Sequence, residues 1–513
     1  METTIRLALP DTLNRTVFLD KITDHYNTIP ESPDIFHRSY YDTFDWRLYK
    51  KGLLLCRGGR TYQLLSQKHV VTASATIASH GTKPRYWWDF PVGPLQHQLR
   101  ALLGVRALLH LATLKTEVHG KRLLNSDQKT VLHIRHEDVF ITNSKAESHL
   151  QRAVVLCPMR GYPDELRKFR LHLESLSINN EAADPFLAAL KTVGVKPGSY
   201  TSKLNIALAP DMSARAAARR IFFHLLRTLR QNEKGIKADI DTEFLHDYRV
   251  AIRRTRSALT QFKGVFPAQA TEQFKQDFAY LGKLTNRLRD LDVYLLKRQE
   301  YCDLLPERLR PALDSLFQNL ATERRDELKK FILEMDTDNY RGTLAQWERF
   351  LADSKNEVME PSTNSSIHAL NLAQSIIYKR FKKIIKIGKR IHAESPDKEL
   401  HRLRIECKKL RYSLEFFTSL FPKQDLDYLV KQLKKLQDNL GDFNDLHVQQ
   451  VNLSQYLTTI KGVGARTVLQ AAAVGGLITQ LNTRQHEVRR SFTKSFQLFS
   501  SPENIALFKK LFH

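Results

Sequence analysis

Cysteine is scarce in this sequence of 513 residues: four copies occur, far apart and without Cys-x-x-Cys spacing. This pattern argues against a disulfide framework and against a thiolate zinc site, and it fits a reducing compartment. Long apolar runs are missing too, because the longest weakly polar stretch, residues 468–481, is too short to span a bilayer. The first residues also lack the basic region and the apolar core of a secretory signal. We therefore expect a cytoplasmic protein with no membrane insertion.

Common catalytic motifs are absent as well. The sequence contains no GxGxxG, no GxxxxGK(S/T) and no GxSxG, so dinucleotide-binding, P-loop and serine-hydrolase sites are not indicated. His119, His133 and His136 lie in short β-type segments without an acidic cluster beside them. Isolated histidines of this kind are more often plain core or surface residues than metal ligands. We accordingly predict no metal site, no catalytic residue and no bound cofactor.

Acidic residues are outnumbered: 55 Asp and Glu stand against 80 Lys and Arg, which gives a formal net charge of +25. An excess of this size predicts an extended anionic partner, such as polyphosphate, nucleic acid or an acidic membrane surface. Charge alone does not distinguish among these three. The hydrophobic content of 42 % is enough to fill the cores of about two or three folded domains.

A helical segment occurs twice in the second part of the chain. Residues 245–267, LHDYRVAIRRTRSALTQFKGVFP, are echoed by residues 400–422, LHRLRIECKKLRYSLEFFTSLFP, at a constant offset of 155 residues. The offset superimposes four cationic positions: His246 on His401, Arg249 on Arg404, Arg253 on Lys408 and Arg256 on Arg411. It also places Asp290 on Asp445. Two copies of one helical unit are therefore predicted.

The spacing of these cations puts them on one face of each helix. Steps of three or four residues bring side chains together at about 100° per residue, while Leu245, Ile252 and Leu259 lie on the adjoining face. Like charges at this spacing cost roughly 0.2 to 0.5 kcal/mol per pair, so the pattern predicts an anion-binding face. The alternative is that the cations form ion pairs between helices, with carboxylates such as Asp290, Asp292, Asp442 and Asp445.

The helices that precede the two copies add further cations. Before the second copy, one helical face carries Lys379, Lys383 and Lys386. Before the first copy, Arg220 and Arg227 take positions of the same spacing. Each repeat is thus expected to present two basic stripes.

The repeated segments resemble the CHAD family, the conserved histidine α-helical domain. LHDYRVAIRRTR with RLRDLDV in the first copy and HRLRIECKKLRY with LGDFNDLHV in the second carry the resemblance, which covers the chain from about residue 213 onward. It implies an all-α domain of two pseudo-symmetric helical bundles whose basic stripes face a central channel. Members of the family bind inorganic polyphosphate.

The resemblance implies that the cations of both copies bind polyphosphate. They are His246, Arg249, Arg253, Arg256, His401, Arg404, Lys408 and Arg411, with Arg220, Arg227, Lys379, Lys383 and Lys386 from the preceding helices. The sequence departs from the family in having Lys408 and Lys409 in place of arginines. That change keeps the charge but loses bidentate geometry.

The first two hundred residues have a different character. Short β-type segments such as LLLC, TYQLLSQ and DVFITN are separated by Gly, Asn, Asp and Ser, whereas long amphipathic patterns begin near residue 213. We therefore predict an α+β multidomain protein. An antiparallel β-rich domain is expected at 1–205 and an all-α domain at 206–513, with repeats at about 213–355 and 365–513.

The first domain is similar to the CYTH, or triphosphate tunnel, family. YYDTFDWRLYKKGLLLCRGG at 40–59 and TYQLLSQK ending at Lys68 carry the likeness, and Arg122 and Gly161 add to it. The resemblance implies an eight-stranded antiparallel barrel whose bore holds a triphosphate with Lys and Arg side chains. Candidates for that lining are Arg6, Arg57, Lys68, Arg85 and Arg122. Surface cations on alternate strand positions are the alternative interpretation.

Departures from that family bear on catalysis. The family begins with an ExExK motif whose glutamates hold a divalent metal, but this sequence has Glu2, Thr4 and Arg6. A second glutamate pair of the family is replaced by Val155 and Cys157. Phosphoryl transfer needs Mg²⁺ or Mn²⁺, and these hard cations need oxygen ligands. The domain is therefore expected to be degenerate and non-catalytic, and to bind phosphates at most.

The function predicted from the sequence is binding of inorganic polyphosphate through a basic channel between two helical repeats. Two alternatives stay open: a Mg²⁺-dependent inorganic triphosphatase of the CYTH type, and a nucleic-acid-binding protein. The second is disfavoured because no aromatic platform interleaves with the basic stripes. Triphosphate is a further expected ligand of the barrel, and polyphosphate granules are an expected location. The sequence leaves the oligomeric state open.

Overall fold

The computed structural model describes residues 4–10, 12–66, 69–77, 84–143, 146–353, 363–392, 394–462 and 464–513. The chain divides into two compact units, Met1–Thr201 and Ser202–His513. Among the helices of the described residues, none is both long enough and apolar enough to cross a membrane.

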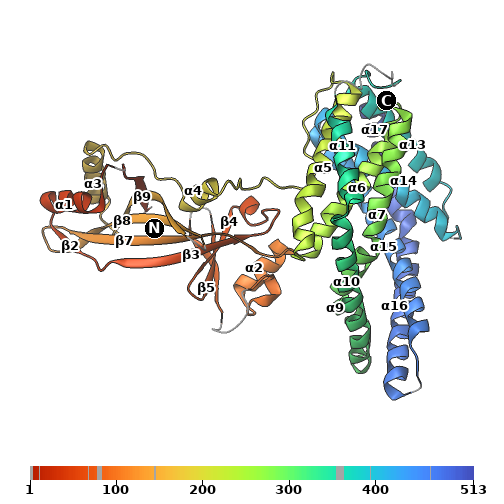
Figure 1. Cartoon of the computed structure of the whole chain (residues 1–513), viewed down its shortest axis with the longest axis horizontal. Helices are drawn as coiled ribbons and strands as arrows, with labels where there is room; N and C mark the ends of the chain where they lie inside the picture. Colours follow the sequence, from red (N-terminus) through yellow and green to blue (C-terminus); the bar gives the residue numbers. More distant parts are fainter. Residues whose placement is uncertain are drawn as a thin grey trace. The chain divides into compact units, whose positions relative to one another are not determined.

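The first unit is built on one antiparallel sheet (Figure 1). Its strands are β1 (Ile5–Ala8), β2 (Thr28–Pro30), β3 (Asp34–Asp42), β4 (Leu53–Gly58), β5 (Thr61–Ser66), β6 (Val71–Thr76), β7 (Leu109–Leu124), β8 (Thr130–Asn143) and β9 (Ala146–Pro158). Eight of them follow the order β1-β9-β8-β7-β3-β4-β5-β6, and β2 pairs with β7 beside this path. Within the described residues, β1 and β6 end the order and no pairing joins them. The predicted antiparallel β-rich fold is confirmed.

Four helices cover the sheet on both of its faces. They are α1 (Arg15–His25), α2 (Pro94–Leu103), α3 (Pro163–Ser175) and α4 (Pro185–Thr192). Phe18 of α1 and Phe169 of α3 are buried against the face formed by β1, β7, β8 and β9. On the other face, Phe186 of α4 stacks on Tyr40 of β3, with ring centroids 4.8 Å apart. Because successive strand side chains point to opposite faces, each long strand contributes to both cores.

The second unit consists of helices joined by short turns. In the first repeat they are α5 (Ala214–Lys237), α6 (Thr242–Gln261), α7 (Ala268–Leu284), α8 (Asn286–Leu296), α9 (Arg298–Asp303), α10 (Asp314–Met335) and α11 (Asp338–Ala352). In the second they are α13 (Ala369–Gly388), α14 (Asp397–Phe416), α15 (Lys423–Thr459), α16 (Ala465–Phe499) and α17 (Pro502–Phe512). α5 packs on α6 as α13 packs on α14. The predicted α+β class and helical repeats are confirmed.

The two repeats share a core where α6 contacts α14. Phe262, at the end of α6, has its ring centroid 5.9 Å from that of Phe416 and 5.7 Å from that of Phe417. Beside these rings, the Ser413 hydroxyl donates a buried 2.7 Å hydrogen bond to the Gln261 side chain. The motif helices of both repeats are thereby fixed against each other by apolar and polar contacts.

A close approach between α5 and α6 depends on Gly235. A Cβ at this position would overlap the buried ring of Phe244, whereas Gly342, inside α11, has open space around the same position. Gly235→Ala is therefore expected to lower the free energy of unfolding by roughly 1 to 3 kcal/mol, the cost of overpacking. Gly342→Ala should raise it by about 0.5 to 1 kcal/mol through helix propensity. Chemical denaturation measures both, and equal effects would contradict the close approach.

Candidate anion-binding site

The motif cations project from α6 and α14, whose other faces are buried in the core. Tyr248 and Ile252 of α6 are 0 % and 2 % exposed, and Leu403 and Leu410 of α14 are both 0 % exposed. The helical period then places the motif cations at the edge of this core. Arg253, Arg256 and His401 are exposed, while His246, Arg249, Arg404, Lys408 and Arg411 are half-buried.

Arg249 is anchored by neutral groups at the junction of α7 and α8. Its guanidinium donates a 2.6 Å hydrogen bond to the Thr285 hydroxyl and a 3.0 Å hydrogen bond to the Asn286 side chain. Burial, followed by the charge of Arg253, lowers the pKa of Arg249 to about 10. The arginine is therefore held in place without being neutralised by a hydrogen-bonded carboxylate.

Cations of the two repeats meet around Arg253. Burial, followed by the charges of Arg404 and Arg253, lowers the pKa of Lys408 to about 7. Burial also lowers the pKa of Arg404, and the charge of Arg253 acts in the same direction. An exposed arginine of α6 thus lies within electrostatic range of two cations of α14. An anion placed among the three would relieve their repulsion and raise the pKa of Lys408.

Several cations of the second repeat are paired with carboxylates. Arg404 lies 3.3 Å from Asp445, and Arg411 lies 2.8 Å from Glu415. Lys383 of α13 lies 2.9 Å from a buried carboxylate of α14. That carboxylate, Glu406, also contacts Arg380 at 2.9 Å and Lys409 at 3.0 Å. For this repeat, the ion-pair interpretation of the stripes holds in part.

Two of the related cations in the first repeat, Arg249 and Arg256, have no such carboxylate partner among the described residues. Arg227, Arg253 and Arg256 form no ion pair with any residue that the structure describes. Arg220 donates a 3.0 Å hydrogen bond to a backbone carbonyl, that of Ala207. The offset of 155 residues places Ala251 and Thr260 where the second repeat has Glu406 and Glu415. The related positions therefore differ at Arg256 and Arg411, whereas Arg254 of α6 is paired with Glu415 just as the related Lys409 is paired with Glu406.

The remaining predicted cations of the second repeat differ in their surroundings. Lys379 and Lys386 are exposed and form no ion pair within the described part of the chain. Nδ1 of His401 lies 2.7 Å from the side-chain oxygen of Asn444. The structure therefore fixes His401 through a neutral partner and leaves both lysines on the surface of α13.

Two equivalent aspartates lie near the motif cations. Burial raises the pKa of Asp290, and the charge of Asp445 raises it further, while Arg249 opposes this shift. The carboxylates related by the offset therefore lie within range of each other. Asp292 takes a different role, because it is buried and accepts a 2.8 Å hydrogen bond from Arg324. It belongs to a separate ion-pair network.

Sequence reasoning missed the carboxylates that compensate the second repeat. The contacts Glu406 to Lys409 and Arg411 to Glu415 are three and four residues apart along α14, so their spacing was a usable signal. Arg254 of α6, however, is 161 residues from its partner Glu415, at a distance of 2.6 Å. No local pattern in the sequence indicates that bridge.

The cations predicted for the first unit are not gathered at one place. Arg6 of β1 and Arg135 of β8 both lie directly opposite Val155 of β9, so they share one face of the sheet. Arg135 also lies opposite Gly120 of β7, two residues from Arg122, so Arg122 is on the same face. Arg6 forms a 2.5 Å ion pair with Glu137 of β8.

Arg57 lies on the opposite face, where its guanidinium is 5.6 Å from the centroid of the Tyr62 ring. Arg85 lies in the loop before α2, and Lys68 lies outside the described residues.

Sequence reasoning also missed Arg135 and Glu31 on the face of Arg122. Glu31 lies 2.5 Å from His133 and 3.8 Å from Arg135, so cations and carboxylates mix on this face. Among the described residues, no group of three or more His, Cys, Asp or Glu side chains is arranged to hold a metal ion.

Comparisons with known proteins bear on the helical unit. The family model described as CHAD domain matches residues 220–454. The crystal structure of the CHAD domain from the plant Ricinus communis is similar over 59 % of this chain and 96 % of that chain, with 24 % identity and a TM-score of 0.48. PptA from Streptomyces chartreusis is similar over 56 % of this chain and 100 % of that chain, with 14 % identity and a TM-score of 0.42. No curated protein matches the sequence.

The low pKa of Lys408 can be measured directly. NMR titration of the lysine side chains, with the Lys408 signal assigned by its loss in Lys408→Arg, should show a midpoint near pH 7 rather than at the ordinary value of 10.5. Arg253→Ala should raise this midpoint because it removes a neighbouring cation, whereas Arg325→Ala on α10 should leave it unchanged. A midpoint near the ordinary value would show that the cations do not converge.

Proposed function

We propose that this chain, which contains a CHAD domain, binds inorganic polyphosphate along the surface where α6 and α14 meet. The observation that carries the proposal is the contact of α6 with α14, which brings the electrostatically coupled cations Arg253, Arg404 and Lys408 of the two repeats to one surface. Like charges on two contacting helices favour a ligand that brings closely spaced negative charges. A linear polyphosphate has one charge or more on every phosphate and can contact cations along both helices.

Binding is electrostatic and needs no covalent chemistry. The guanidinium groups of Arg253 and Arg256 are exposed and can each donate two hydrogen bonds to phosphate oxygens. Arg249 stands behind them, already oriented by Thr285 and Asn286. Each contact displaces a counterion from the polyanion, so affinity falls steeply as salt rises.

Lys408 couples this binding to pH. In the free protein its pKa is lowered to about 7, so above that pH the side chain is mostly neutral. A bound polyanion raises the pKa, and the complex takes up a proton in the range between the free and the bound value. Affinity therefore decreases as the pH rises through this range.

We further propose that the first unit is a CYTH-like domain that has no catalytic activity and binds triphosphate at most. Val155 and Cys157 replace carboxylates on β9, and Arg6 is paired with Glu137. We place the protein in the cytoplasm, at polyphosphate granules. Release of phosphate from triphosphate with Mg²⁺ would contradict the non-catalytic role.

Removing the uncompensated cations of α6 tests the proposal. Arg253→Ala/Arg256→Ala should weaken polyphosphate binding and reduce the slope of log affinity against log salt by roughly two, about one for each lost phosphate contact. Arg325→Ala/Lys329→Ala removes the same charge from exposed positions of α10 and should leave the slope unchanged. Binding is measured by titration at several salt concentrations, with circular dichroism to verify helical content. Equal slopes in both double variants would refute the proposed site.

Competition separates polyphosphate from nucleic acid. Long-chain polyphosphate should displace labelled single-stranded RNA at equal phosphate concentration, because the described basic surface offers charge without a stacking platform. If RNA instead displaces polyphosphate, the helical unit is a nucleic-acid binder.

The charge difference between the repeats gives a second test. Glu406→Gln should strengthen polyphosphate binding, because Lys383, Arg380 and Lys409 would lose a shared negative partner. The expected gain is roughly threefold, or about 0.6 kcal/mol, because Lys383 and Lys409 are themselves partly exposed. Glu406 is buried, so circular dichroism of the variant verifies that it stays folded. Glu399→Gln, on the same helix and paired only with Arg402 at 3.9 Å among the described residues, is the matched control. A gain that is equal in both variants would reflect net charge alone.

A further inference from the structure

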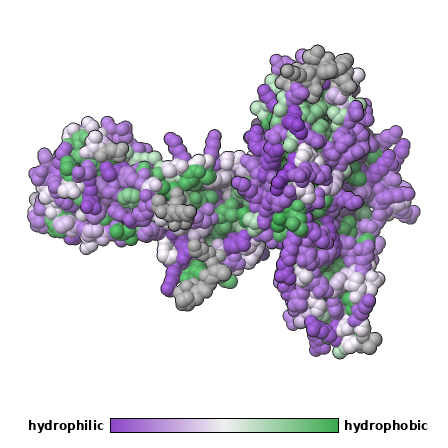
Figure 2. Space-filling model, in the orientation of Figure 1, coloured by the Kyte–Doolittle hydropathy of each residue, from purple (hydrophilic) through white to green (hydrophobic). Residues whose placement is uncertain are grey.

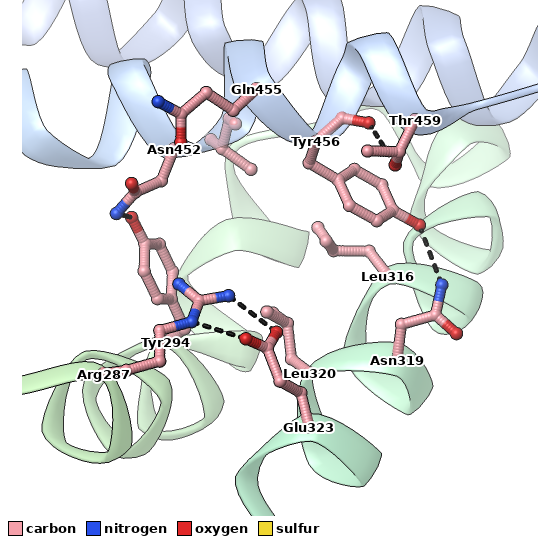
Figure 3. A pocket seen from close by; sticks show the side chains of 11 residues that line it. Arg287, Tyr294, Leu316, Asn319, Leu320, Glu323, Asn452, Gln455, Tyr456 and Thr459 are labelled. Carbon is pink, nitrogen blue, oxygen red and sulfur yellow. Dashed lines mark hydrogen bonds and ion pairs between the residues drawn. The ribbon is translucent and has the colours of Figure 1, made fainter. Parts of the chain in front are cut away.

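A cavity of about 370 Å³ lies within the helical unit (Figure 3). α8 and α10 of the first repeat and α15 of the second repeat form its walls. Its volume falls in the range of about 300 to 1,000 Å³ that is typical of small-molecule sites. The cations proposed to bind polyphosphate do not line it, so the polyphosphate site does not account for it.

The floor of the cavity is apolar. Leu316 and Leu320 of α10 and Leu453 of α15 line it and are 1 %, 9 % and 3 % exposed. Figure 3 shows Tyr294 and Tyr456 at two sides of this floor. Leucine side chains between two aromatic rings favour a ligand whose body is a flat, apolar ring.

The rim presents hydrogen-bonding groups in fixed positions. The Tyr294 hydroxyl accepts a 2.7 Å hydrogen bond from Asn452. The Tyr456 hydroxyl accepts hydrogen bonds of 2.6 Å from Gln470 and 3.3 Å from Asn319. Both phenolic oxygens are occupied as acceptors, so each hydroxyl keeps its hydrogen for donation, and the amide oxygens remain as acceptors. A ligand with donors and acceptors around a ring matches this rim.

The charge of the rim is balanced. Arg287 and Glu323 form two parallel hydrogen bonds of 2.5 and 2.6 Å, so the guanidinium is neutralised by a single carboxylate. The hydrogen bonds to Glu323 also raise the pKa of Arg287. No uncompensated cation of the described lining is available for a phosphate, which distinguishes this cavity from the surface of α6 and α14.

The polar rim is not a consequence of the repeat. At the offset of 155 residues, Arg287 corresponds to Asp442 and Tyr294 to Gln449. Gln449 is buried and accepts a 2.6 Å hydrogen bond from Tyr301, so it has a structural role in its own place. The polar rim residues of α8 are therefore not reproduced at the related positions of the second repeat.

We infer that this cavity binds a neutral, planar heterocycle of the nucleobase class, with its ring on the leucine floor and its edge at the tyrosine and amide rim. Stacking and edge contacts with aromatic side chains hold such rings irrespective of charge. Hydrogen bonds from the two tyrosines fix the orientation of the ring. The inference is independent of polyphosphate binding.

Adenosine is the probe that tests the inference, because it carries a purine ring and no phosphate. The full chain should bind adenosine in a calorimetric titration. Gln455→Trp, at an exposed lining position, should fill the mouth of the cavity and weaken binding by about tenfold or more, whereas Ser454→Trp, at the next exposed position outside the lining, should change it by less than about twofold. Tyr456→Phe removes one hydroxyl without filling the cavity and should weaken binding by roughly threefold.

Two outcomes would overturn the inference. One is a wild-type chain that does not bind adenosine, and the other is a Gln455→Trp variant that binds it as well as the wild type. Polyphosphate titration of the same variants is the folding control, and its affinity should be unchanged. Because the probe has no phosphate, loss of the polyphosphate proposal leaves this test intact, and the reverse also holds.

Discussion

Repulsion among like charges is the main constraint on the helical unit, because its packing must hold several cations on one surface. Arg253, Arg404 and Lys408 come from two repeats and lie within one another's fields, so the surface they form must be held together by contacts behind it. Phe262 packs there against Phe416, at the contact of α6 with α14. Apolar burial is not weakened by the moderate salt that screens exposed charges. The fold therefore keeps its basic surface assembled under conditions in which a bound polyanion would dissociate.

The placement of the motif cations could be predicted from the sequence, whereas their compensation could not. A constant offset and the helical period fix the face of each cation without any tertiary information, and Arg253 could be matched to Lys408 by counting. Ion pairs that join different helices leave no such trace: Arg254 is 161 residues from Glu415, and Arg380 is 26 residues from Glu406. These distant carboxylates decide whether the cations of a stripe are available to a bound anion or form ion pairs within the protein.

In the sheet, the sequence alone does not determine which face each strand side chain occupies. The β-rich character follows from composition, but a difference of one residue in register moves a side chain to the other face. The family resemblance predicts Arg57 and Arg122 in one lining, but the pairing of β3 with β4 and β7 puts them on opposite faces. Arg135 was overlooked although it shares the face of Arg122. A family likeness indicates which cations belong to a site only when the register that aligns them is known.

The two repeats share one arrangement of helices but differ in which of their cations are paired with carboxylates. Ala251 and Thr260 occupy the places of Glu406 and Glu415, so Arg256 lacks, among the described residues, the carboxylate partner that the related Arg411 has in Glu415. A symmetric pair of fully charged stripes would repel more strongly across the contact of α6 with α14. Ion pairs of Arg404 and Arg411 with carboxylates reduce that repulsion, and the lowered pKa of Lys408 removes part of the remaining charge. The asymmetry thus reconciles a stable interface with the basic surface that we propose as the polyanion site.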